Sequence, residues 1–171
     1  MLKRPESNEY SSNQAVYIEV VPEGDLIGIL KQQIKDTVAL LSDLTADKAG
    51  FRYAPGKWSI KEVVGHMADT ERIMSYRLLR FARGDNTSLA GFDEDAYVKG
   101  ASFDSSSLAD LLDSLAAVRT ATLALLKGIT PEVFLRLGSA NQSVLSVRAL
   151  AYIIAGHELH HQNVLKERYL G

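Results

Sequence analysis

The chain has 171 residues, of which 46% are apolar, and a formal net charge of −2, so one domain with a sizeable core is expected. The contents of 12 glycines and 4 prolines exclude a collagenous or low-complexity chain, and the charge balance argues against a nucleic-acid partner. The chain has no cysteine, which excludes disulfides and thiolate ligands. Any metal must therefore be held by His, Asp or Glu.

Residues 1–22 are expected to form an N-terminal arm, of which residues 1–16 have the composition of a mobile segment. The β-branched run that follows, residues 16–21, favours an extended conformation up to Pro22. The polar start lacks the apolar segment of a secretory signal, and the longest apolar run, residues 149–156, is too short to cross a bilayer. We therefore expect a soluble, cytoplasmic protein with no membrane partner.

Four amphipathic helices are predicted within a single domain of residues 23–171. Apolar residues recur every three or four positions in segments 25–44, 59–83, 106–127 and 146–169. The second segment begins with Ser59-Ile60-Lys61-Glu62, the S-x-x-E pattern of a capping box. Helices of about 20 residues predict an all-α four-helix bundle, and the connections are long enough to allow crossovers.

The connection over residues 85–104 carries an acidic stretch, Asp93-Glu94-Asp95, and room for one or two helical turns. Its carboxylates could lie at the mouth of a cleft. They could also form an ordinary solvated turn, and the sequence alone leaves both alternatives open.

All four histidines fall on predicted helices: His66 on the second, and His157, His160 and His161 on the fourth. At about 100° per residue, His157 and His161 lie about 40° apart, within the apolar stripe. Two imidazoles in a core need partners for their nitrogens, which a metal ion or an ordinary hydrogen-bonded pair would supply. His160, at the edge of the stripe, could replace one ligand, support the site or be a partly exposed helix residue.

The second helix offers a third candidate ligand. His66 lies about 90° from the apolar centre of its helix, on a face that also carries Glu62 and Asp69. This mixture suits a semi-open polar cleft with a ligand and supporting carboxylates, and the alternative is a solvated histidine on the helix flank.

The segment His157-Glu158-Leu159-His160-His161 also satisfies H-E-x-x-H, the zinc-protease pattern in which the glutamate is the general base. A protease of this kind needs a further ligand, normally downstream. Only ten residues follow His161, and they lack the metzincin extension, so a protease is not predicted. Glu158 remains a candidate for supporting the ligands or lining the pocket.

Two segments together resemble the DinB-like superfamily, most closely its YfiT-type branch. Residues 58–72 contain the W-S-x-x-E helix start with a following histidine, and residues 156–169 contain H-x-x-x-H near the C-terminus. The resemblance covers about residues 20–170. It implies a four-helix bundle, a homodimer, and a divalent metal, usually zinc or nickel, held by His66, His157 and His161.

The resemblance also implies an activity, because characterised relatives include thiol-S-transferases that use a low-molecular-weight thiol such as bacillithiol. We therefore expect a metal-dependent enzyme that activates such a thiol to attack a small-molecule substrate. The alternatives are a metal-dependent hydrolase and a non-catalytic dimeric module that binds a metal or ligand. Three neutral imidazoles leave the metal its +2 charge and at least one open position. The charge lowers the pKa of a water or thiol bound there, which suits both hydrolysis and thiol transfer.

Overall fold

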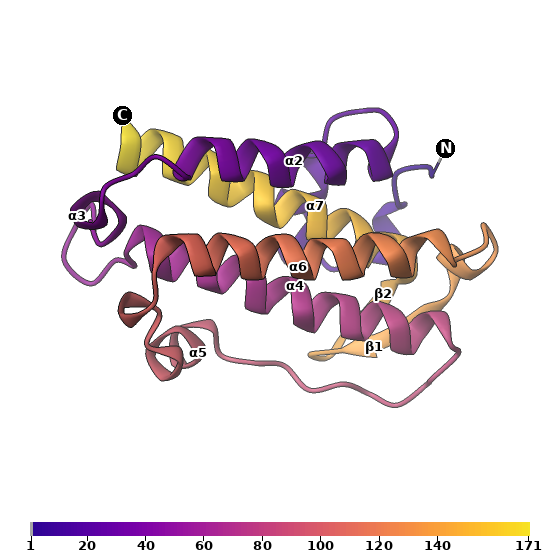
Figure 1. Ribbon diagram of the computed structural model, residues 1–171. Helices are drawn as coiled ribbons and strands as arrows, with labels where there is room; N and C mark the ends of the chain where they lie inside the picture. Colours follow the sequence, from indigo (N-terminus) through magenta and orange to yellow (C-terminus); the bar gives the residue numbers. More distant parts are fainter. Residues whose placement is uncertain (1) are drawn as a thin grey trace.

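The computed structural model describes residues 2–171, which form a bundle of four long helices with short elements around it (Figure 1). The long helices are α2 (Leu26–Leu41), α4 (Ile60–Ala82), α6 (Leu108–Lys127) and α7 (Val147–Val164), and α7 continues into a π-helical turn, η5 (Leu165–Leu170). These helices coincide with the four predicted segments, so the all-α bundle is confirmed. Within residues 2–171, no helix combines the length and apolar character needed to cross a membrane.

Each long helix begins where a side chain caps its first turn. The cap oxygen accepts a hydrogen bond from the backbone N–H three residues later, which satisfies one of the free donors at a helix start. The caps are Asp25, Ser59, Ser107 and Ser146. At Ser59 the predicted capping box is complete, because the Glu62 carboxylate also accepts from the Ser59 backbone N–H at 2.8 Å.

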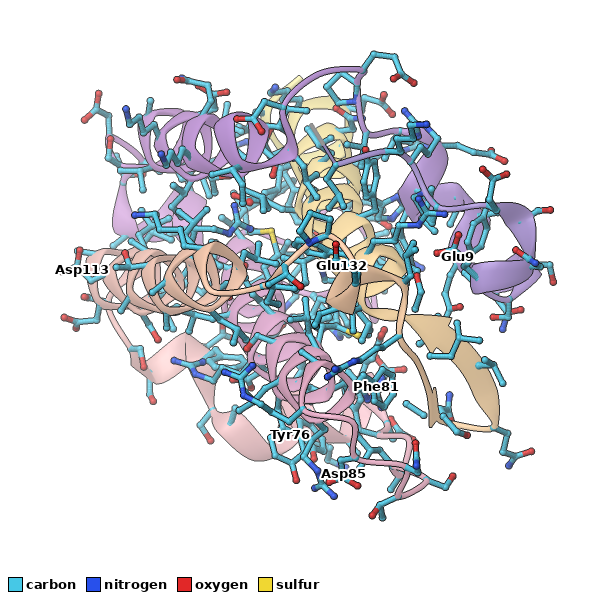
Figure 2. The ribbon with its side chains drawn as sticks, turned by 90° about the vertical axis from the view of Figure 1, so that its right-hand side faces the viewer. Glu9, Tyr76, Phe81, Asp85, Asp113 and Glu132 are labelled. Carbon is cyan, nitrogen blue, oxygen red and sulfur yellow. The ribbon has the colours of Figure 1, made fainter. Side chains whose placement is uncertain are left out.

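The short elements connect and cover the bundle. They comprise α1 (Ala15–Glu19), α3 (Ala46–Ala49), α5 (Glu94–Ala101), the 3-10 turns η1 (Ser7–Glu9), η2 (Ser12–Gln14), η3 (Phe103–Ser105) and η4 (Val133–Leu135), and an antiparallel hairpin of β1 (Leu137–Ala140) and β2 (Ser143–Ser146). The hairpin packs so closely on Phe81, labelled in Figure 2, that a Cβ at Gly138 would lie 2.1 Å from the Phe81 ring. Glycine is therefore required at this contact.

The predicted extended conformation of residues 16–21 is wrong, because residues 15–19 form helix α1. The backbone of α1 lies directly on α7, and a Cβ added at Gly156 would come 1.7 Å from the Tyr17 carbonyl oxygen. Ile18 is completely buried in this contact. Packing against α7 thus outweighs the β propensity of the local sequence.

The rest of the arm makes specific contacts within itself and with the bundle. Arg4 donates to the carbonyl oxygens of Ile18 and Val21, and Arg148 at the start of α7 pairs with Glu9, which Figure 2 labels. Although burial would raise it, the hydrogen bonds from Arg148 lower the pKa of Glu9 to about 2.

The core has three sections along the bundle. One apolar cluster includes Leu30, Phe81 and Leu150, and a second includes Met67 and Leu115. Most of the buried polar side chains of the long helices fall between these clusters in the sequence of each helix, and His66 lies at the edge of the second cluster on α4: Gln33, Thr37, His66, Thr70, Glu71, Arg119, Thr122, His157, Glu158 and Gln162. All four helices therefore contribute to one buried polar layer, in which the predicted ligands lie.

Candidate metal centre

Three histidines converge where α4 and α7 lie side by side (Figure 1). His66 comes from α4, and His157 and His161 come from successive turns of α7. The Nε2 atom of His157 lies 3.0 Å from Nε2 of His66 and 3.2 Å from Nε2 of His161. The structure thus brings the three predicted ligands together, with His66 and His157 buried and His161 half-buried.

This arrangement of nitrogens fits a divalent metal ion. A tetrahedral ion with bonds of about 2.0–2.1 Å to imidazole holds its ligand nitrogens about 3.3 Å apart, close to the distances found here. Nε2 of a neutral His157 has either one proton or one lone pair, so it cannot make two good hydrogen bonds to its neighbours. A shared cation would satisfy all three nitrogens.

The protonation state of the cluster also suits a metal. Burial lowers the pKa of His66 to about 4, although Asp95 opposes the shift. Burial and the neighbouring histidines lower the pKa of His161 to about 3 and that of His157 well below its ordinary value. All three imidazoles are therefore neutral near pH 7, which is the form that binds a metal.

A cleft of ≈ 380 Å³ gives access to the cluster through His161. Its wall combines aromatic and charged side chains: Tyr53, Lys57, Trp58, Asp95, His160 and Tyr169. The Trp58 ring lies 4.6 Å from the His66 ring, measured between centroids, and the Trp58 carbonyl accepts a hydrogen bond from Tyr169. The acidic connection thus does place a carboxylate at the cleft, that of Asp95.

The other predicted site residues lie outside the three-histidine cluster. His160 is on the cleft wall, with its ring centroid 5.2 Å from that of His161. Glu62 is held by the Ser59 cap and by Arg52, so its carboxylate is not directed at the cluster. Asp69 pairs with Arg72 at 3.0 Å near the surface of α4.

Glu158 lies in a buried ion cluster that the sequence interpretation missed. Arg119 on α6 donates to both carboxylate oxygens of Glu71 on α4, at 2.9 and 2.7 Å, and its Nη2 lies 2.7 Å from Oε2 of Glu158. Burial opposes the charge of Arg119, but Glu71 and then Glu158 raise its pKa above the ordinary value. Burial raises the pKa of Glu158 despite this guanidinium.

A sequence signal for this ion cluster was present. Arg119 lies four residues after Leu115, and Glu71 lies four residues after Met67, so both charges interrupt apolar stripes of their helices. Opposite charges on two such stripes indicate a buried ion pair. Tyr17, whose ring packs against His157 and His160, carried no such signal because it lies in the predicted arm.

The chain is a four-helix bundle with three neutral histidines beside an open cleft. This fold and site define a class of helical proteins suited to bind a divalent metal. The sequence matches the DinB superfamily over residues 29–165, and the chain belongs to this superfamily. The fold is similar to that of YfiT from Bacillus subtilis, described as "a probable metal-dependent hydrolase with an unusual four-helix bundle topology". The TM-score is 0.77 at 18% identity, over 86% of this chain and 90% of YfiT. No curated protein sequence matches the chain.

Proposed function

We propose that the chain is a metal-dependent hydrolase that acts on a small molecule bound in the cleft beside His161. The convergence of three Nε2 atoms at the inner end of this cleft carries the proposal. The description of YfiT as a probable metal-dependent hydrolase supports hydrolysis over the thiol transfer that the sequence resemblance implied.

His66, His157 and His161 would hold the metal, and three imidazoles with no thiolate suit zinc or nickel better than magnesium. The bound ion would act as a Lewis acid and lower the pKa of a water molecule. A structural zinc is normally closed by four protein ligands, whereas this cluster supplies three. The remaining position is thus available to solvent or substrate.

The cleft wall supplies the other groups that a hydrolase needs. His160 and Asp95 lie on this wall, and both side chains are of types that serve as a general base in hydrolysis. Tyr53, Trp58 and Tyr169 offer aromatic surface that would orient an apolar part of the substrate and exclude bulk water.

The test is hydrolysis of a panel of esters, amides and phosphoesters by the zinc-loaded and nickel-loaded protein. We expect turnover that stops with a chelator and with His161→Ala, while circular dichroism shows that the variant is folded. His160→Ala and Asp95→Asn should both keep the metal, and the variant that loses turnover identifies which side chain is the general base. Binding of one metal per chain with no turnover of any substrate would instead favour a non-catalytic binding module.

Thiol transfer is the second candidate, because three neutral nitrogen ligands leave a position for a thiolate and the chain has no cysteine to compete for it. Supplying the same protein with an electrophile and a small thiol separates the two reactions. A reaction that requires the thiol would identify a transferase, and hydrolysis without the thiol would identify a hydrolase.

A further inference from the structure

A small internal cavity borders His157. Its volume is ≈ 10 Å³, about the space needed by one water molecule, and its polar wall consists of Thr70, Glu71, His157 and Glu158. A buried water molecule needs two to four polar partners, and this wall provides them.

Two groups on the cavity wall can each make a further hydrogen bond. Oε2 of Glu158 is buried 2.7 Å from Nη2 of Arg119, and a carboxylate oxygen has two lone pairs, so it can accept one further hydrogen bond. The contacts that His157 makes with His66 and His161 both use Nε2. A neutral imidazole that presents its Nε2 lone pair carries its proton on Nδ1, and this N–H requires an acceptor.

We propose that one water molecule fills this cavity, accepts a hydrogen bond from Nδ1 of His157 and donates one to Oε2 of Glu158. The ion cluster of Arg119, Glu71 and Glu158 then acts as the positioning framework of the metal centre. This proposal rests on the three-histidine metal site proposed above.

The ion cluster is well suited to this role because it is fixed to all four long helices. Glu71 belongs to α4, Arg119 to α6 and Glu158 to α7, and Arg119 also donates to the Leu30 carbonyl of α2 at 2.9 Å. Thr37 of α2 donates to the other oxygen of Glu158 at 2.5 Å. A carboxylate held in this way fixes the ring orientation and tautomer of a metal-binding histidine.

The main test measures the Co²⁺ dissociation constant by competition with a chelator, together with the visible spectrum of the bound ion. Glu158→Gln should weaken Co²⁺ binding about tenfold and change the spectrum. Glu9→Gln is the matched control, since it makes the same change in a partly buried arginine–glutamate pair outside the ion cluster, that of Arg148. It should lower stability and leave the Co²⁺ constant within about twofold.

A second pair of variants decides the matter if Glu158→Gln does not fold. Thr70→Val removes a hydroxyl that lines the cavity and also lies 3.5 Å from Nδ1 of His66, so the crystal structure of this variant must show whether the water molecule is lost. Thr122→Val removes a buried hydroxyl that lies outside this wall and has no hydrogen-bond partner. We expect Thr70→Val to weaken Co²⁺ binding several-fold and Thr122→Val to leave it unchanged. A crystal structure should show a water molecule between His157 and Glu158.

The outcomes separate this proposal from the proposed function. If the unmodified protein binds no Co²⁺, the metal-dependent function itself is wrong. If it binds Co²⁺ and Glu158→Gln binds as tightly as Glu9→Gln, the metal site stands and the positioning role is overturned. A crystal structure with no water molecule between His157 and Glu158 would overturn it as well.

Discussion

The bundle buries two polar clusters, the ion cluster and the histidine cluster. They differ in whether the chain itself supplies partners for their polar atoms. In the ion cluster, the N–H groups of Arg119 meet two carboxylates and a backbone carbonyl. In the histidine cluster, three neutral rings converge on each other, and Nδ1 of His161 is buried without a partner. His157 and Glu158 are neighbours in sequence, yet each belongs to a different cluster. The ion cluster has its own opposite charges and therefore stabilises the fold. The histidine cluster consists of three neutral bases with no proton donor between them, and a bound cation would satisfy their lone pairs.

The largest effect should come from breaking the cluster that is complete. Arg119→Ala leaves Glu71 and Glu158 buried without their counter-ion, so it should lower the free energy of unfolding by about 3–5 kcal/mol. Chemical denaturation measures the change. A loss below about 1 kcal/mol would show that the ion cluster is not buried as described.

The pair of Glu9 with Arg148 provides a comparison outside both clusters. Folding lowers the pKa of Glu9 to about 2, so the pair stabilises the protein fully above the unfolded-state pKa of about 4.5. This contribution, at most about 3 kcal/mol, is lost as the pH falls from about 5 to 2. Glu9→Gln should flatten the dependence of stability on pH in that window. An unchanged slope would contradict the pairing.

Trp58 joins the aromatic cleft wall to the histidine cluster and is half-buried. Trp58→Ala should therefore lower the free energy of unfolding by about 2 kcal/mol, less than a fully buried tryptophan, and should also weaken metal binding. Trp58→Phe, which keeps a ring, is the control. An unchanged melting temperature for Trp58→Ala would contradict its packing role.

The smallest effect should come from the histidine cluster in the absence of metal. His157→Ala removes a ring whose nitrogens need the ion, so we expect a loss of about 1 kcal/mol in the metal-free protein. With metal at 100 times its dissociation constant, the unmodified protein should gain about 2.7 kcal/mol and the variant should gain nothing. Equal gains in both proteins would place the metal elsewhere.

The long helices could be predicted because the information is local: apolar periodicity sets each helix, and capping residues such as Ser59 and Ser146 set where it begins. The hairpin of β1 and β2 was missed because its strands have only four residues each. Helix α1 was mistaken for an extended segment because its conformation depends on the contact with Gly156, far away in the sequence.

The candidate site was only partly predictable from the residues themselves. His157 and His161 share a helix face, so their spacing placed them together, whereas His66 lay on a helix flank and was assigned through the family resemblance. The structure buries His66 because its ring lies between Trp58 and the two histidines of α7. The cavity between His157 and Glu158 arises from packing and has no sequence pattern.

The most direct measurement is the metal content of the purified, tag-free protein and of its four histidine variants after equilibration with zinc or nickel and dialysis. The expected result is about one ion per chain for the unmodified protein and for His160→Ala, and none for His157→Ala or His161→Ala, with His66→Ala strongly reduced. Full metal content in both His157→Ala and His161→Ala would contradict the three-histidine site.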